Sequence, residues 1–170
     1  MARRGAHRQV GLGLAAAVFV ADQLSKWLVT GPLDLAARGT IRLLPIFDFR
    51  WVANYGVSMG FLTAGSATQR WLLVAFTAAI ACAVAIWLWR ERRREDAIAL
   101  GLVLGGAAGN ILDRVRFAHV VDFADLHFGD WHPFLVFNVA DAAITIGVLL
   151  LLLRALLTRK EREPAEDVHA

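Results

Sequence analysis

The chain has 170 residues, of which 58% are hydrophobic, and its mean hydropathy is +0.53. A soluble domain of this length has too little volume for its surface to bury that much apolar area, so the composition excludes an ordinary soluble fold. The formal net charge is +3, but the arginines flank apolar runs and do not form one patch. That distribution argues against a nucleic-acid-binding protein.

Four apolar stretches carry the excess hydrophobicity, and each is close to the ~20 residues that cross a ~30 Å hydrocarbon core. We predict membrane-spanning helices at approximately 10–29, 71–89, 97–112 and 137–157. The segments of about 30–70 and 113–136 would then lie on the same side of the membrane. The sequence therefore predicts a single membrane domain, residues 1–170, which is an all-α integral membrane protein with four transmembrane helices.

Basic clusters indicate which side faces the cytoplasm. They precede the first span, join the second to the third and follow the fourth: Arg3, Arg4 and Arg8; Arg90, Arg92, Arg93 and Arg94; Arg154, Arg159, Lys160 and Arg162. With four crossings, all three clusters fall on one side, which the positive-inside rule assigns to the cytoplasm. We therefore expect both termini inside and the segments 30–70 and 113–136 outside.

The first span also has the basic start and alanine-rich core of a cleaved signal peptide. Its apolar run, however, continues through residues 27–29 after a polar interruption at Asp22 and Gln23, so a retained span is favoured. The only cysteine, Cys82, lies inside the second span, which excludes disulfides and cysteine-based metal sites.

The first outer segment is too long to be a simple connection. Within it, residues 47–51 alternate apolar and polar side chains, the period of a strand with one buried face. We predict a small extracytoplasmic sheet on the membrane surface, with Phe47, Phe49 and Trp51 against lipid or substrate. The alternative is that these rings only anchor the chain at the interface. The second outer segment is interpreted in the same way from Phe128, Trp131 and Phe134.

Charged residues inside the spans are a strong functional signal, since each costs at least ~2.5–3.5 kcal/mol on insertion scales. At a rise of ~1.5 Å per residue, Asp22 lies about 18 Å along the first helix and Asp113 about 24 Å along the third. Asp141 lies about 6 Å inside the outer start of the fourth. All three belong to the outer half of the membrane. The amide side chains at similar depth or just above it are Asn54, Asn110 and Asn138.

Two of the acids have a cation nearby in the sequence. Asp22 and Lys26 are spaced i and i+4, so they can pair on one helix face, and Asp113 is followed by Arg114. For these acids, a structural ion pair is at least as good an interpretation as catalysis.

Asp122 and Asp141 have no basic neighbour within a few residues except His119. Two such carboxylates at one membrane level can share a proton, as in aspartic proteases. There, one carboxylate activates water while its protonated partner polarises the scissile carbonyl. Sequence spacing does not show that the two residues meet, so the residues alone leave this dyad as a hypothesis.

Two other classes of protein stay open on the residues alone. A proton-coupled carrier also uses intramembrane acids, although it would need them at mid-bilayer. A Ser/Lys peptidase would use Lys26 with Ser25 or Ser58. The histidines form no metal-binding motif and no phosphate-binding glycine loop is present, so we expect neither a metal nor an organic cofactor.

Five motifs resemble those of one family, in the family's order, across residues 22–141. They are D-Q-L-S-K at 22–26, N-Y-G-V-S at 54–58, G-G-A-A-G-N-I-L-D-R at 105–114, V-V-D-F at 120–123 and F-N-V-A-D at 137–141. The family is signal peptidase II, the bacterial lipoprotein signal peptidase.

This resemblance implies an aspartic endopeptidase of the bacterial inner membrane, with its active site near the outer face. It implies cleavage of prolipoproteins on the N-terminal side of a diacylglyceryl-modified cysteine, with no metal or cofactor. The expected partners are prolipoproteins, membrane lipid and globomycin-type cyclic peptide inhibitors. Carried over residue by residue, Asp122 and Asp141 are catalytic, Asn54, Gly56, Asn110, Arg114 and Asn138 bind substrate, and Asp22, Lys26 and Asp113 support the site.

Overall fold

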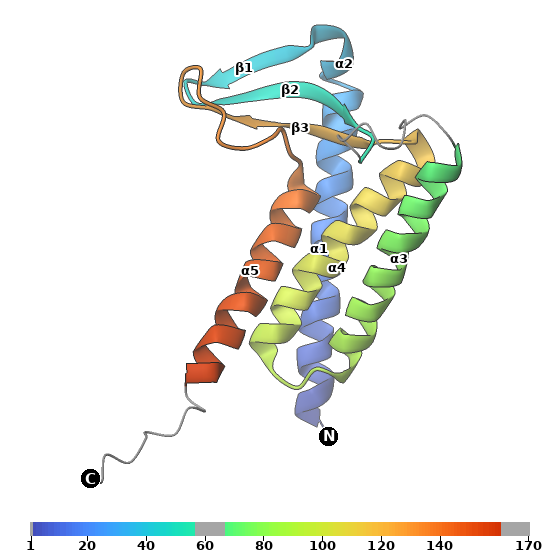
Figure 1. The fold of residues 1–170 in the computed structure, drawn as a ribbon, viewed down its shortest axis with the longest axis vertical. Coiled ribbons are helices and arrows are strands. Elements are labelled where there is room, and N and C mark those ends of the chain that lie inside the picture. The colour runs from blue at the N-terminus through green and yellow to red at the C-terminus, as the bar shows by residue number, and fades with distance from the viewer. Residues whose placement is uncertain (1, 57–66, 161–170) are drawn as a thin grey trace, which may run out of the picture.

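A bundle of four long helices carries a small three-stranded sheet across one end (Figure 1). The computed structural model of the protein describes residues 2–56 and 67–160. In chain order the elements are α1 (Ala2–Thr30), α2 (Leu35–Arg38), β1 (Thr40–Leu44), β2 (Phe47–Asn54), α3 (Ala67–Arg90), α4 (Arg94–Phe117), β3 (Val120–Leu126) and α5 (Val139–Lys160). Within this part of the chain, four helices are long and apolar enough to cross a membrane, which confirms the predicted number of spans.

The helices begin and end several residues away from the boundaries that hydropathy indicates, and two of these differences bear on the site. α4 continues to Phe117 and not to 112, so Asp113 and Arg114 lie inside a helix and not in an outer segment. Hydropathy stops at the first charged residue, although here the charge of Asp113 is fully buried. α5 begins at Val139 because Phe137 is still paired with Ala124 through a β-bridge.

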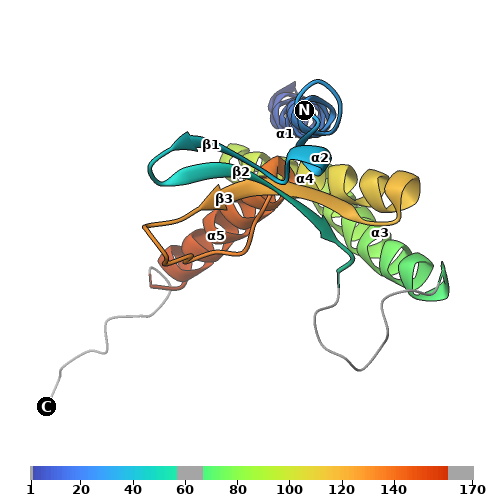
Figure 2. The same ribbon diagram turned by 90° about the horizontal axis from the view of Figure 1, so that it is seen from above.

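The helix α4 lies between α1, α3 and α5 and contacts all three (Figure 2). Its closest approach to α1 depends on the absence of side chains. A Cβ atom on Gly105 would collide with the main chain of Ala15, and one on Gly109 would collide with the carboxyl group of Asp22. Small residues at such positions let helix backbones approach closely in membranes. Here they also bring Asp22 directly against α4.

The basic clusters lie at the end of the bundle opposite the sheet. Figure 1 shows the start of α1, the connection between α3 and α4, and the C-terminal end of α5 together at that end. That connection holds the basic run of residues 90–94. The four helices therefore separate the basic clusters from the sheet, which is the separation that the charge pattern predicts.

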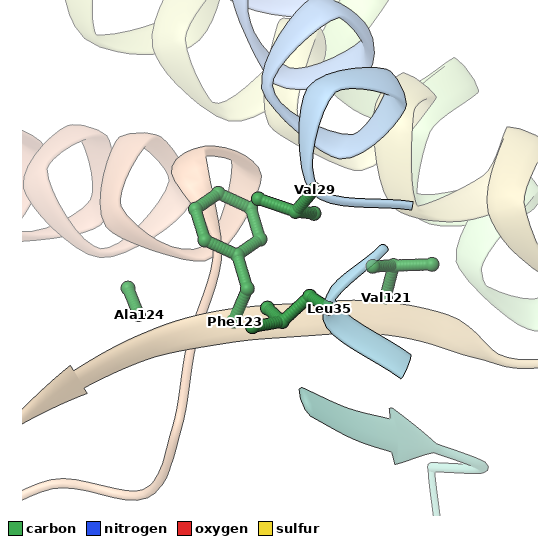
Figure 3. Close-up of a cluster of buried hydrophobic side chains, with 5 residues drawn as sticks. All are labelled: Val29, Leu35, Val121, Phe123 and Ala124. Atoms are coloured by element: carbon green, nitrogen blue, oxygen red, sulfur yellow. The ribbon is translucent and has the colours of Figure 1, made fainter. Parts of the chain in front are cut away.

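The sheet has the order β1-β2-β3 with antiparallel pairing throughout. A small apolar cluster joins it to the end of α1 and is drawn in Figure 3: Val29, Leu35, Val121, Phe123 and Ala124. Phe47, Phe49 and Trp51, which we expected against lipid or substrate, pack on this cluster and stay partly exposed. The predicted strand is confirmed, but its aromatic side chains pack against the core of the sheet.

The strand β3 contains a bulge that affects the direction of its side chains. The amides of Phe123 and Ala124 both donate to the carbonyl of Phe137, at 3.1 and 2.7 Å. Two successive donors on one acceptor are typical of a bulge, which shifts the alternation of side chains by one residue. Asp122 and Asp125 are three residues apart, yet they consequently line the same cavity.

The segment between β3 and α5 exposes large apolar side chains. Phe128, Trp131 and Phe134 are 48%, 65% and 60% exposed, and Leu135 is 91% exposed. Phe128 and Trp131 face each other across a tight bridge. This exposure fits the interpretation of the segment as an interfacial anchor, since such rings favour the boundary between lipid and water.

Candidate active site

Asp141 is held by a reciprocal cap at the start of α5. The side-chain oxygen of Asn138 accepts a hydrogen bond from the Asp141 amide at 2.8 Å, and the Asp141 carboxylate accepts one from the Asn138 amide at 3.3 Å. This is the geometry of a capping box, in which the residues at the cap and three positions later satisfy each other's backbone. The spacing of the N-V-A-D motif therefore has a local cause. Asn110 also donates to this carboxylate, at 2.8 Å.

Asp122 is 1% exposed and is held by amide groups from two directions. Asn138 donates to one carboxylate oxygen at 2.7 Å, and Asn54 donates to the other at 2.9 Å. Asn138 is thus bonded to both Asp122 and Asp141, and joins the first half of β3 to the first turn of α5. Among the residues described, no basic side chain lies within ion-pair distance of either carboxylate.

Lys26 is the cation of a separate buried group on the α1 side. Its ammonium nitrogen lies 2.8 Å from Asp22 and 2.7 Å from Asp113, and it donates to the side-chain oxygen of Asn110 at 3.1 Å. Asp22 and Asp113 are both 0% exposed. The i, i+4 pair predicted for Asp22 and Lys26 is confirmed. The pairing proposed for Asp113 with its neighbour Arg114 was wrong, because the cation that contacts Asp113 is Lys26.

Each of these two supporting carboxylates fixes the backbone beside one residue of the predicted pair. Asp22 accepts a hydrogen bond from the amide of Ala140 at 3.0 Å, next to Asp141. Asp113 accepts one from the amide of Val121 at 3.1 Å, next to Asp122. Lys26 lies between the two carboxylates, so this ionic group connects α1, α4, β3 and α5 around the site.

Arg114 and Gly56 lie together at the edge of the site. Arg114 donates to the carbonyl of Asn110 at 3.4 Å, whereas its buried Nε atom has no hydrogen-bond partner among the described residues. Gly56 has φ +89°, and a Cβ atom there would press on Leu73 and come within 3.4 Å of an Arg114 nitrogen. Asn54 accepts a hydrogen bond from the Gly56 amide at 2.8 Å, which fixes this turn. Residues 57–66, including Ser58, lie outside the described residues.

The environment of Asp122 changes its acidity. Burial raises the pKa of Asp122 from 3.8 to about 6. The hydrogen bonds from Asn54 and Asn138 oppose this rise, while the negative charge of Asp141 adds to it. Two carboxylates that repel each other's ionisation are typical of a pair that holds one proton.

An open cavity of about 730 Å³ leads to Asp122 and is also lined by Asn54 and Gly56. Among residues 2–56 and 67–160, no group of three or more His, Cys, Asp or Glu side chains is arranged to hold a metal ion. The site therefore consists of carboxyl and amide groups with one nearby guanidinium.

Two features of the site were missed at the sequence level. Gln23 donates to both Asp22 and Asp113, at 3.1 and 3.0 Å, and so completes the ionic group. Its place inside the D-Q-L-S-K motif was the signal that could have indicated this role. Asp125 shares the cavity with Asp122, which only the bulge in β3 makes possible.

The fold and the site define a class: a multi-pass membrane protein with a pair of amide-bound carboxylates, one of them fully buried, at one end of its helices. The family model for signal peptidase (SPase) II matches residues 14–157. The chain is 62% identical over 167 residues to a lipoprotein signal peptidase of Rhizorhabdus wittichii, covering 98% of this chain and 97% of that protein. It is 52% identical to one of Sphingopyxis alaskensis, covering 96% and 94%.

Solved structures agree with the sequence comparisons. A bacterial membrane enzyme determined at 2.3 Å superposes with a TM-score of 0.75 at 26% identity, covering 94% of both chains. The chain therefore belongs to the signal peptidase II family of bacterial membrane proteins. Enzymes of this family are aspartic peptidases that remove signal peptides from prolipoproteins, and this chain is such an enzyme.

Proposed function

We propose that the enzyme cleaves prolipoproteins on the N-terminal side of a diacylglyceryl-modified cysteine, with Asp122 and Asp141 as its catalytic pair. The observation that carries this assignment is the position of Asn138. Its side chain donates to Asp122, and its reciprocal cap holds Asp141. Two other buried acids, Asp22 and Asp113, both form ion pairs with Lys26.

We assign the shared proton to Asp122, whose pKa is raised by burial to about 6. Asp141 then takes a proton from water, whose oxygen attacks the carbonyl carbon before the modified cysteine. Asp122 gives its proton to the carbonyl oxygen. The tetrahedral intermediate collapses by breaking the C–N bond, the cysteine nitrogen leaves with the proton from Asp141, and Asp122 regains a proton from the new hydroxyl group.

Arg114 has the chemistry for stabilising the charge that develops on the substrate oxygen. It is close enough to both carboxylates for their charges to act on it, yet its Nε atom has no partner among the described residues. A guanidinium donor aimed at a developing oxyanion is worth most in a site that excludes water. We therefore assign Arg114 to the carbonyl of the scissile bond.

The amide residues act on substrate mainly through the carboxylates. Asn54 and Asn138 are bonded to Asp122, and Asn110 to Asp141, so these donors orient the pair. Gly56 keeps the cavity open where a side chain would press on Leu73 and Arg114.

The Ser/Lys alternative is disfavoured by the contacts of Lys26. An ammonium group has three N–H donors, and three acceptors surround this one: Asp22, Asp113 and Asn110. Ser25 meanwhile donates to the carbonyl of Asp22 at 2.7 Å. Neither side chain therefore contacts the other, and the Lys26 nitrogen is fully occupied by its three acceptors.

We further propose that both termini are cytoplasmic and that the site faces the outside of the bacterial inner membrane. The basic clusters at the end opposite the sheet support this orientation. The lipid anchor of the substrate would then remain in the outer leaflet beside the exposed apolar faces of α3 and α5. A globomycin-type cyclic peptide would compete for the cavity that leads to Asp122.

Cleavage of a diacylglyceryl-modified prolipoprotein by the purified enzyme tests the assignment. We expect Asp122→Asn and Asp141→Asn each to lower the rate by about 10²–10⁴-fold, the usual contribution of a general acid or base. Asp34→Asn is the matched control, since Asp34 is exposed and its left-handed backbone also suits asparagine. Wild-type rates in either catalytic variant would refute the pair. Equal cleavage of unmodified precursor would refute the requirement for the lipid.

A further inference from the structure

A second polar cluster lines the same cavity and is not used by the proposed mechanism. The Asp125 side chain in β3 is 5% exposed and accepts a hydrogen bond from His132 Nδ1 at 3.0 Å. It also lies 3.6 Å from a guanidinium nitrogen of Arg50 in β2. Arg50 and His132 are 53% and 42% exposed, and both line the cavity. The carboxylate of the cluster is thus buried, whereas the guanidinium and imidazole groups are exposed to the cavity.

The neighbouring charged residues, Asp48 and His127, do not offset the positive charge of Arg50 in the cavity. Asp48 lies opposite Asp125 in the sheet and pairs with His127 at 3.3 Å, and these two side chains are 13% and 15% exposed. Neither of them lines the cavity. A peptide in the cavity would therefore contact the guanidinium of Arg50 and not the Asp48–His127 pair.

The distance between the cluster and Asp122 corresponds to a few peptide residues. Asp122 and Asp125 are three positions apart on a strand, or about 10 Å at ~3.3 Å per residue. An extended peptide that passes Asp122 with its scissile bond would reach Asp125 with a residue about three positions away. The sheet lies beyond the ends of the helices (Figure 1), and the signal peptide must enter the membrane. The mature side of the substrate, which stays outside the membrane, is therefore the part that can lie along the sheet beside the cluster.

We propose that Arg50 and His132, both oriented by the buried carboxylate of Asp125, form a subsite that prefers an acidic side chain at about the third residue of the mature lipoprotein. The modified cysteine is counted here as the first residue. This inference rests on the proposed function, because it assumes that the scissile bond lies at Asp122. It adds a source of substrate preference that is separate from catalysis.

The test uses full-length enzyme in detergent and diacylglyceryl peptides that carry Asp, Asn or Lys at the third mature residue. The readout is the ratio of kcat/KM for the Asp peptide to that for the Lys peptide. A partly exposed ion pair is worth up to about 1 kcal/mol, so we expect a ratio of roughly five for the wild type. Arg50→Glu should invert the preference, and Arg50→Gln should bring the ratio close to one.

Arg42→Glu is the matched control, because Arg42 is an exposed arginine of the same sheet that does not line the cavity. It should keep the wild-type ratio. An unchanged ratio in both Arg50 variants would overturn the subsite, as would a charge preference only at the third residue before the scissile bond. Failure of the underlying function looks different, since the wild type would then cleave none of the peptides or Asp122→Asn would cleave them all.

Discussion

The site contains two pairs of carboxylates whose hydrogen-bond and charge partners differ. Asp22 and Asp113 share one cation, Lys26, and each also accepts a hydrogen bond from a backbone amide. Asp122 and Asp141 have only amide donors at hydrogen-bond distance among the described residues. The first pair is held in an ion pair with the ammonium group, whereas the second pair accepts from amide donors that bring no counter-charge. The first pair is suited to building the site and the second to chemistry.

The largest effect should come from removing the cation of the supporting pair. Lys26→Met would leave two fully buried carboxylates without a counter-charge, and breaking a buried ion pair from one side costs about 3–5 kcal/mol. We expect a large loss of thermal stability, measured by tryptophan fluorescence in detergent, together with loss of cleavage. The double variant Lys26→Met with Asp113→Asn should recover part of that stability, because one of the unpaired charges is gone.

A partly exposed cation at the other end of the bundle is a control for this prediction. Arg154 contacts Glu95 at 3.2 Å and Asp96 at 2.8 Å, but Glu95 is 69% exposed. Replacing Arg154 with methionine should cost less than about 1 kcal/mol, as expected of ion pairs near water. Equal losses of stability for Lys26→Met and Arg154→Met would contradict the distinct structural role of the Lys26 group.

A smaller effect should follow from changing the residue shared by the catalytic pair. Asn138→Ala removes both the donor to Asp122 and the cap of α5, and losing such a cap costs about 1 kcal/mol. Asn138→Ser keeps a capping oxygen but loses the donor. We expect both variants to cleave at least about 10-fold more slowly, with only the alanine variant losing stability. Normal cleavage by Asn138→Ser would show that the contact with Asp122 is dispensable.

The sequence was sufficient for elements whose cause is local. The four spans follow from apolar length, β2 from its alternation, and the Asp22–Lys26 pair from the helical repeat. Motif resemblance, and not hydropathy, pointed to Asp122 and Asp141, since nothing local shows that they share Asn138.

Features that depend on distant segments could not be predicted. Asp113 selects Lys26 from another helix over its neighbour Arg114, because the absence of a side chain at Gly109 brings α1 close. The pairing of Phe137 delays the start of α5, and the same residue produces the bulge in β3. The contact between Phe137 and β3 cannot be recognised from a pattern of residues that are neighbours in the sequence.

The smallest predicted effect is a shift in pH dependence that tests whether Asp122 holds the proton. With a pKa of about 6, Asp122 loses its proton as the pH rises through that value, so kcat/KM should fall on the alkaline side. The hydrogen bond from Asn54 lowers this pKa. Asn54→Leu should therefore raise it and move the alkaline limb to higher pH, whereas the Asp34→Asn control should keep the wild-type profile. The limb reports the pair as a whole, and activity that rises and does not fall as the pH passes about 6 would mean that the ionised form of Asp122 is the active one.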